Sequence, residues 1–365
     1  MRVFLVVLAC LSAFSAAAAE RVRVVIATGL PEAAMSRGAS AVALRGEVVR
    51  SLRNASRVEE WGDTGAFAAE IDARDLESLR RDPRVRAVSI DDGGEGAMLE
   101  SLPVVGIDLV RAQGLDGSGV TIAVLDTGID TDHPDFAGRV VAQQCFCDNG
   151  DGTGCCPGGE KERSGAGAAE DDHGHGTHVS GIIAGGGNVA PTGIAPKAAI
   201  VSVKVMNGAN KFRSFTQIFR GLEWILHAHP EAAVINMSLG SSTLFSSADC
   251  ANAAVALGME PVVTKLRERG VLITASSGNS ASLSGTTLPA CMAAVLGIGA
   301  TYDADMSYRN GVCESLTAKR DEVVCFTNST DSIDLLAPGA VIVSSFTQNR
   351  FASLAGTSMA APHVA

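Results

Sequence analysis

Four short segments of this sequence place reactive side chains beside small residues, a pattern that suits nucleophilic catalysis. In the first, Val124-Leu125-Asp126-Thr127-Gly128, an aspartate ends a strongly apolar run. Ligand-binding and catalytic groups collect at the carboxyl ends of strands in open α/β sheets, so Asp126 lies where such a group is expected. The alternative for an isolated aspartate is a side chain that caps a turn.

The second segment, Asp172-His173-Gly174-His175-Gly176-Thr177-His178, contains three closely spaced histidines. A histidine at the start of a helix can be held by a carboxylate through one ring nitrogen while the other nitrogen faces a nucleophile. Two other interpretations stay open for this segment alone. One is a structural histidine, and the other is a metal site, because three histidines at this spacing resemble a set of zinc ligands.

The last two segments could complete such a site. In Ala275-Ser276-Ser277-Gly278-Asn279, an asparagine beside a glycine can aim its amide at a developing oxyanion, although Gly-Asn is also a common turn. In Gly356-Thr357-Ser358-Met359-Ala360, small residues let a substrate backbone approach Ser358. A serine at a helix N-terminus offers its own amide and the helix dipole to a negative charge, but as an isolated residue it would be an ordinary helix cap.

Short β-branched runs separated by helical stretches are expected to position these residues. The runs lie at 120–125, 199–205, 233–237, 271–275, 294–298 and 341–344. Near-continuous apolar runs of this kind predict an α/β fold with a mostly parallel sheet and helices on both faces. Ser214-Phe215-Thr216-Gln217 is a capping box that opens one helix, and a second helix is expected between Pro261 and Gly270.

The N-terminal quarter of the chain has a different pattern. Residues 1–19 combine Arg2, a short apolar core and Ala17-Ala18-Ala19, which is typical of a cleavable export signal and too short to span a bilayer. Residues 20–97 predict a small α+β domain with strands at 22–26, 66–71 and 85–90 and a helix that Asp72 caps. The acidic, glycine-rich run 91–96 then marks a boundary before a second domain at 98–365.

Composition and charge limit the classes of function. Hydrophobic residues make up 46% of the 365 residues, enough for a large core, and the formal charge of −11 argues against a nucleic-acid partner. Arginines crowd the first ninety residues, whereas acids dominate later. Opposite charges on two parts of one chain are expected for an N-terminal domain that docks on the domain after it.

The cysteines indicate disulfide bonds. Of nine cysteines, Cys10 falls in the export signal, which leaves an even number in an exported chain. The sequence alone does not fix their connectivity. The expected pairs are Cys313 with Cys325 and Cys250 with Cys291, with Cys145, Cys147, Cys155 and Cys156 paired among themselves.

Taken together, the four segments resemble the subtilisin-like serine proteases, or subtilases, in which aspartate, histidine and serine follow in this chain order. The resemblance covers about residues 99–365, and residues 21–98 resemble the propeptide inhibitor of that family. It implies a secreted serine endopeptidase precursor with a three-layer domain, whose N-terminal domain inhibits it and is removed autocatalytically between Asp91 and Pro103. It also implies a monomer that acts on protein or peptide substrates, outside the cell or in a bacterial periplasm, with no membrane partner once the signal is removed.

The resemblance also gives each matched residue a role. Ser358 would be the nucleophile, His175 the general base, and Asp126 the group that orients His175. Asn279 and the Ser358 amide would bind the oxyanion, and catalysis would need no cofactor. Ser238, Leu239 and Gly240 would pair with the substrate backbone as an added strand, and Ala275, Ser276, Ser277 and Gly278 would line the pocket for the side chain before the scissile bond.

Three features depart from the family pattern. The insertion from Gln143 to Arg163 carries four cysteines, for which disulfides are preferred to a metal knot. Asp135 matches a calcium-ligating position and Glu100 lies near another, but the loop from Gly185 to Asn188 is short, which argues against calcium there. The chain ends seven residues after Ser358 without a cap for the expected helix, so a C-terminal truncation is expected, and the activity of the chain as given stays open.

Two other classes of function compete with a serine endopeptidase. A metallohydrolase built on the three histidines would lose activity on dialysis against a chelator, whereas an enzyme that uses Ser358 would be inactivated by a fluorophosphonate. A non-catalytic secreted binding module would fold without reacting with that reagent. The sequence does not identify the natural substrate, although Met206 and Asn207 suggest a roomy and mostly uncharged pocket.

Overall fold

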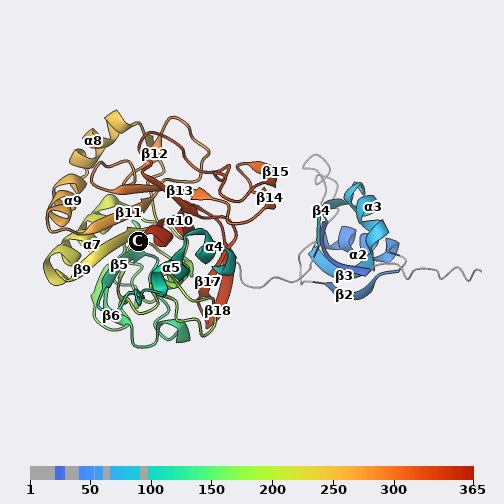
Figure 1. Ribbon diagram of the computed structural model, residues 1–365, viewed down its shortest axis with the longest axis horizontal. Coiled ribbons are helices and arrows are strands. Elements are labelled where there is room, and N and C mark those ends of the chain that lie inside the picture. The colour runs from blue at the N-terminus through green and yellow to red at the C-terminus, as the bar shows by residue number, and fades with distance from the viewer. Residues whose placement is uncertain (1–20, 29–40, 53, 61–65, 91–97) are drawn as a thin grey trace, which may run out of the picture. The chain divides into compact units, whose positions relative to one another are not determined.

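The computed structural model describes residues 21–28, 41–52, 54–60, 66–90 and 98–365 (Figure 1). The chain divides into two compact units, Met1–Gly94 and Glu95–Ala365, and each is described by itself. The predicted export signal and the acidic run 91–96 lie outside the described residues. In the part that is described, no helix combines the length and the apolar character needed to cross a membrane.

The first unit is a four-stranded antiparallel sheet with the strand order β2-β3-β1-β4. Its elements are β1 (Arg21–Thr28), α2 (Ala41–Ser51), β2 (Ser56–Glu60), β3 (Ala66–Asp72), α3 (Leu76–Arg80) and β4 (Val85–Ile90). Val24, Ile26, Val48, Phe67 and Ile71 form a buried core within this unit. The three predicted strands are therefore confirmed, and α2 and β2 are additions that the sequence did not indicate.

The helix predicted after Asp72 begins differently from the expectation. Asp72 accepts a hydrogen bond from the amide of Arg74 and so caps a short 3-10 turn, η1 (Ala73–Asp75), which α3 follows. The cap itself was predicted correctly. A side-chain acceptor satisfies the first free amides of a 3-10 turn as well as those of an α-helix, so the cap does not distinguish the two.

The second unit is built on an eight-stranded sheet with the order β16-β13-β11-β9-β5-β8-β6-β7. All neighbouring strands are parallel except β6 and β7. The strands are β5 (Thr121–Asp126), β6 (Val140–Phe146), β7 (Glu162–Ser164), β8 (Ala199–Lys204), β9 (Ala232–Met237), β11 (Leu272–Ser276), β13 (Leu296–Thr301) and β16 (Leu335–Pro338). The predicted fold class, an α/β domain with a mostly parallel sheet, is confirmed.

Helices cover both faces of this sheet (Figure 1). Successive side chains of a strand point to opposite faces, and in β5 Ile122 and Val124 join one core cluster whereas Ala123 and Leu125 join another. The first cluster includes α6 (His175–Ala184), and the second includes α7 (Phe215–Ala228) and α9 (Met259–Glu268). The other helices are α4 (Met98–Val104), α5 (Ile107–Arg111), α8 (Ser247–Ala256) and α10 (Thr357–Val364).

The run at 341–344 is the exception among the predicted strands of the sheet. It forms β17 (Ile342–Phe346), which pairs antiparallel with β18 (Arg350–Leu354) in a separate hairpin. Gln348 and Asn349 between them have φ of 65° and 54°. Two successive residues in the left-handed region make the tight turn that hairpins favour, so this strand takes a local partner and not the central sheet.

Helix signals and disulfide pairs agree with the expectations. Ser214 and Gln217 form the predicted capping box at the start of α7, and α9 covers most of the second predicted helix. Cys250 is bonded to Cys291 and Cys313 to Cys325. The insertion contains the bonds Cys145–Cys156 and Cys147–Cys155, and residues 145–156 are called the knot below.

Candidate active site

Asp126 and His175 meet directly beyond the carboxyl end of β5. Asp126 is the last residue of that strand and is completely buried. Its Oδ1 accepts a hydrogen bond from the amide of Thr127 and lies 2.7 Å from Nδ1 of His175. Burial lowers the pKa of His175, but the charge and the hydrogen bond of Asp126 outweigh burial, so the net pKa is raised.

Two glycines allow the ring of His175 to reach this position. Gly174, the residue before α6, has φ of 108°, and a Cβ there would come 2.3 Å from the ring of Phe346. A Cβ on Gly176 would come 2.2 Å from the carbonyl oxygen of Gly128. Because only glycine fits at both places, the start of α6 can lie against the loop that follows β5.

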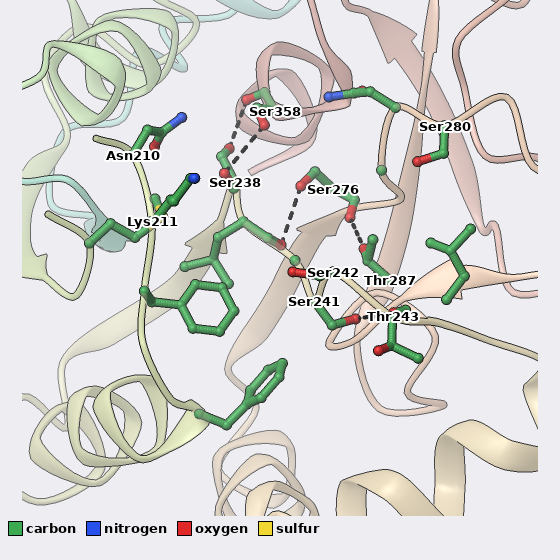
Figure 2. A pocket seen from close by; sticks show the side chains of 18 of the residues that line it. Asn210, Lys211, Ser238, Ser241, Ser242, Thr243, Ser276, Ser280, Thr287 and Ser358 are labelled. Atoms are coloured by element: carbon green, nitrogen blue, oxygen red, sulfur yellow. Dashed lines mark hydrogen bonds between the residues drawn. The ribbon is translucent and has the colours of Figure 1, made fainter. Parts of the chain in front are cut away.

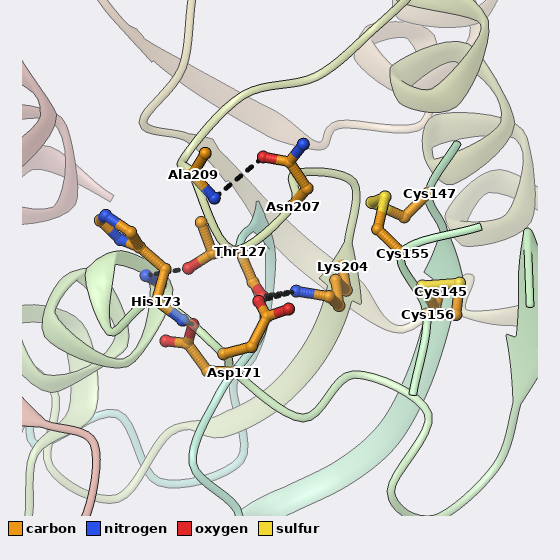
Figure 3. Close-up of polar contacts among 12 residues, drawn as sticks. Thr127, Cys145, Cys147, Cys155, Cys156, Asp171, His173, Lys204, Asn207 and Ala209 are labelled. Atoms are coloured by element: carbon orange, nitrogen blue, oxygen red, sulfur yellow. Dashed lines mark hydrogen bonds and ion pairs between the residues drawn. A yellow bond between two sulfur atoms is a disulfide. The ribbon is translucent and has the colours of Figure 1, made fainter. Parts of the chain in front are cut away.

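Asp171 holds the loop before α6 (Figure 3). Its Oδ1 accepts from the amides of His173 and Gly174, and its Oδ2 accepts from the amide and the hydroxyl of Thr177. Burial raises the pKa of Asp171, but these hydrogen bonds outweigh it and the net pKa is lowered. The ionised carboxylate therefore satisfies the free amides at the start of the helix that carries His175.

Lys204 holds the loop after β5 in place through two hydrogen bonds of its ammonium group. Its ammonium is buried, with only 1% of the side chain exposed, and it donates to the carbonyl of Thr127 and to the carboxylate of Asp172, each at 2.6 Å. The hydroxyl of Thr127 in turn accepts from the amide of Gly176 at 2.8 Å. A buried ammonium is tolerated only with such partners, so the pair fixes the loop between Asp126 and α6.

Ser358 is the second residue of α10, and two hydrogen bonds join it to Ser238 beyond the end of β9 (Figure 2). The hydroxyl of Ser238 donates to the carbonyl of Ser358 at 2.7 Å, and the hydroxyl of Ser358 donates to the carbonyl of Ser238 at 3.3 Å. Helix α10 packs against α6, β11 and β13. The structure thus joins Asp126 to His175, while the proton of Ser358 is directed to the carbonyl of Ser238.

Asn279 is held by its carbonyl oxygen, which leaves its amide free to donate. Its Oδ1 accepts from the amide of Thr357 at 2.8 Å and from the hydroxyl of Thr357 at 2.9 Å. The same hydroxyl accepts from the amide of Gly278 at 3.0 Å. Thr357 directly precedes Ser358, so these contacts place the Nδ2 donor of Asn279 beside the N-terminus of α10, where a negative charge is stabilised.

Most of the predicted substrate-binding residues line one cleft of about 780 Å³. Ser358 and Asn279 lie at its wall together with the predicted residues Ser238, Leu239, Gly240, Ser276 and Gly278. Ala275 and Ser277 are completely buried and are not among the residues that line this cleft. Alternate side chains of a strand point to opposite faces, which accounts for the difference between Ser276 and its two neighbours.

The three histidines of the second segment do not converge. The Nε2 of His178 lies 3.0 Å from the carbonyls of Ile342 and Ala352, and burial lowers the pKa of His178 to about 3. His173 accepts a hydrogen bond from the amide of His175 through Nδ1. Among the described residues no group of three or more His, Cys, Asp or Glu side chains is arranged to hold a metal ion. The ring of His178 therefore connects α6 to the hairpin β17–β18.

The surroundings of Asp135 do not fit a calcium ion. Its carboxylate accepts hydrogen bonds from the amides of Asn188, Val189 and Ala190 and from the hydroxyl of Ser345, at 2.6 to 3.0 Å. Calcium needs oxygen ligands, whereas these are N–H and O–H donors that use both carboxylate oxygens. The side chain of Glu100 lies outside the described residues. Asp135 is thus an anchor for the short loop after α6.

Comparisons with known proteins relate this chain to one family of proteases. A sequence profile of the Subtilase family matches residues 117–365. An alkaline protease of Alkalihalobacillus alcalophilus is 33% identical over 315 residues, which cover 84% of this chain and 69% of that protein. Subtilisin Savinase of Lederbergia lenta is 35% identical over 267 residues, which cover 71% of this chain and 80% of that protein. The crystal structure of a cold adapted subtilisin-like serine proteinase matches with a TM-score of 0.50 and 27% identity, over 68% of this chain and 74% of that chain.

Proposed function

The chain belongs to the subtilase family and is a serine-type endopeptidase, and on this premise we propose that Ser358, His175 and Asp126 carry out its hydrolysis of peptide bonds. The observation that carries the proposal is the 2.7 Å contact between Asp126 and Nδ1 of His175, in the unit whose cleft Ser358 lines. This contact fixes the tautomer, because Nδ1 donates its proton to the carboxylate and Nε2 is left as the basic nitrogen.

In the proposed acylation step, the hydroxyl of Ser358 attacks the carbonyl carbon of the substrate. His175 takes the hydroxyl proton at Nε2 and later delivers it to the leaving amine. This step requires the Ser358 side chain to rotate away from the carbonyl of Ser238, to which its hydroxyl donates in the structure. Hydrogen bonds of this kind commonly tighten only when substrate is bound. Asp126 stabilises the imidazolium that forms, and water then hydrolyses the acyl-enzyme by the reverse proton transfers.

The oxyanion of the tetrahedral intermediate is assigned to two donors, Nδ2 of Asn279 and the amide of Ser358. The support for this assignment is the double contact of Asn279 Oδ1 with Thr357, which fixes which end of the side-chain amide faces the cleft. Loss of one such donor costs about 10²–10³-fold in kcat, a magnitude known from subtilisin itself. No step of this chemistry uses a cofactor.

The N-terminal unit is proposed to be an inhibitory domain that the enzyme removes from itself. Its support is a separate buried core, followed in the sequence by the acidic, glycine-rich run 91–96 that separates it from the protease domain. Export from the cell is proposed from the signal-like residues 1–19 and from four disulfide bonds, which persist in oxidising compartments.

A fluorophosphonate probe tests the proposed nucleophile in the full chain. We expect the wild type to be labelled at Ser358, as located by peptide mass spectrometry, and Ser358→Ala to be unlabelled and to stay uncut as a precursor. Ser280→Ala is the matched control, because Ser280 is another exposed serine at the same cleft, and it should keep the label.

Three outcomes would contradict parts of the proposal. Labelling that survives in Ser358→Ala would exclude this serine as the nucleophile. Loss of hydrolysis on dialysis against a chelator, with labelling of Ser358 unchanged, would favour metal-dependent chemistry. Normal processing of purified Ser358→Ala precursor would count against self-cleavage.

A further inference from the structure

The cleft that Ser358 lines has two walls of different character (Figure 2). One wall is formed by residues 210–215, and the other by residues 238–244 after β9. The second wall carries small and hydroxyl-bearing residues, with Ser238 next to Ser358 and with Ser241, Ser242 and Thr243 farther along the cleft. The ionisable side chains among the described lining residues therefore all lie on the first wall.

The charge on that wall is positive, although the chain as a whole carries −11. Among the described residues that line the cleft, Lys211 and Arg213 are the only ones with ionisable side chains, and both are exposed. Neither forms an ion pair with a described carboxylate. An unpaired cation at the rim of a cleft attracts a complementary charge on a ligand and repels a like charge.

Lys211 is held on a compact turn. Asn207 donates its amide to the carbonyl of Lys211 at 2.9 Å, and its Oδ1 accepts from the amides of Ala209 and Lys211 at 3.0 and 3.2 Å. Nδ2 of Asn207 donates to Asn149 in the knot at 3.3 Å. In Figure 3 the turn lies near the disulfide-bonded knot. The hydrogen bond from Asn207 to Asn149 therefore ties the backbone that carries Lys211 to the knot.

Arg213 is held differently from Lys211. Its side chain lies against Gly150 of the knot, where an added Cβ would come 2.5 Å from Nε. This packing directs the guanidinium toward the knot. In Figure 2 the amine of Lys211 extends to the side of its wall where Ser238 and Ser358 lie. Lys211 is thus the cation available to a substrate.

We propose that Lys211 selects substrates with an acidic side chain a few residues before the scissile bond. This inference rests on the proposed function, because it assigns residues 238–240 to the acyl side of the substrate. Aromatic and aliphatic side chains that include Phe212, Phe215, Leu239 and Phe245 line the same cleft, so an apolar side chain is expected near the acidic one. The substrate class is a protein segment that combines an aspartate or glutamate with a large apolar residue.

The chain itself contains a segment that carries this charge. Asp91, Asp92 and Glu95 fall in the interval proposed for self-cleavage. A peptide with the sequence of residues 89–98 is therefore a natural probe, and a variant in which Asn and Gln replace its three acids is the matched neutral peptide.

The test compares quenched-fluorescence peptides that differ only by Asp or Asn at each of four positions before the cleaved bond. The ratio of kcat/KM for Asp over Asn is measured for the wild type, Lys211→Glu, Lys211→Gln and Lys265→Glu. Lys265→Glu makes the same charge change on an exposed lysine of α9 that does not line the cleft. For an exposed charge pair we expect a ratio of about fivefold at one position in the wild type, which decreases as salt is added.

The expected result is that the ratio falls to about one in Lys211→Gln, falls below one in Lys211→Glu, and is kept in Lys265→Glu. The peptide of residues 89–98 should be preferred over its neutral form by the wild type and by Lys265→Glu, but by neither Lys211 variant. Cleavage of neutral peptides with a ratio near one at every position would overturn the inference and leave the proposed function intact. An equal loss in Lys265→Glu would also overturn it, because net charge would then explain the preference. Absence of any cleavage by the wild type would overturn both.

Discussion

At the scale of single residues, the acid–base behaviour of His175 depends on a competition between burial and the charge of Asp126. Burial favours the neutral ring, and the adjacent carboxylate favours the imidazolium; the carboxylate prevails, and the pKa is raised above 6.5. A general base must be neutral to act. As pH falls through this pKa the ring is protonated and activity is lost, so the acid limb of kcat/KM should have its midpoint above pH 6.5.

Asp126→Asn tests this account. The substitution removes the charge that raises the pKa of His175, so the midpoint of the acid limb should move to lower pH. Activity at pH 8 should fall about 10⁴-fold, because the amide can favour the wrong tautomer of the ring. The measurement is a pH profile of kcat/KM with a neutral peptide.

Asp132→Asn is the control for that profile. Asp132 is an exposed carboxylate a few residues farther along the same loop, so its removal should leave the midpoint nearly in place. An acid limb that is the same in Asp126→Asn and the wild type would mean that a group other than His175 controls it.

The chemically distinctive residues could be found from sequence, and the residues that hold them could not. Asp126, His175, Asn279 and Ser358 each sit among small neighbours that mark a close approach of backbone. Lys204 gave no comparable signal, because a lysine that ends a strand is usually exposed. Only the fold shows that its ammonium is buried under Thr127.

At the scale of elements, the start of α6 is stabilised by one carboxylate. Asp171 is 8% exposed and accepts from the backbone amides of His173, Gly174 and Thr177. Its pKa in the folded chain is lowered below the unfolded value. The Asp171 carboxylate therefore stabilises the folded chain at pH values above the pKa that it has in the unfolded chain. This stabilisation is lost as pH falls through the lower pKa of the folded chain.

Asp171→Asn should lower the free energy of unfolding of the second unit by about 3 kcal/mol at pH 7, because a charged acceptor of four hydrogen bonds is lost. Urea unfolding in a Ser358→Ala background, which prevents self-digestion, measures the change as a shift in midpoint at constant slope. The loss of stability as pH falls below the ordinary pKa of an aspartate should also be smaller in the variant. A shift as large in Asp132→Asn would contradict this specific role.

Strands could be predicted from sequence where a residue pattern is compatible with a single type of structure. The apolar runs of β5, β8, β9 and β11 are buried on both faces, and only a covered parallel sheet satisfies such runs. The run that became β17 has the same composition, yet it found a partner through the turn at Gln348 and Asn349. Composition therefore predicted the strand, whereas its pairing depended on turn geometry that the run does not contain.

At the scale of the whole molecule, the second unit keeps its own N-terminal segment in its core. Helix α4 begins at Met98, directly after the acidic run, and its Ser101 and Leu102 are buried. The hydroxyl of Ser101 lies 3.1 Å from Nε2 of His363 in α10, the helix that begins at Thr357 and Ser358. Burial lowers the pKa of His363 to about 4, so the ring is neutral at pH 7 and its two nitrogens bond to Met359 and Ser101.

The position of α4 narrows the proposed maturation site from the interval 91–103 to residues before Met98. A protease binds its substrate in extended form, and residues 98–104 are wound in a helix that packs into the core. N-terminal sequencing of the self-processed chain should therefore give a first residue between Asp92 and Met98. A first residue from Leu99 onward would show that α4 opens during processing.

This arrangement also limits how far the enzyme can shorten itself. A cut upstream of α4 leaves this helix and its contact with His363 in place. A cut within α4 would take away the partner of His363 and expose the buried side of the helix that starts with the nucleophile. Self-processing should therefore stop before α4. A molecule cut within α4 would lose the contact that supports the helix carrying Ser358 and, with it, its activity.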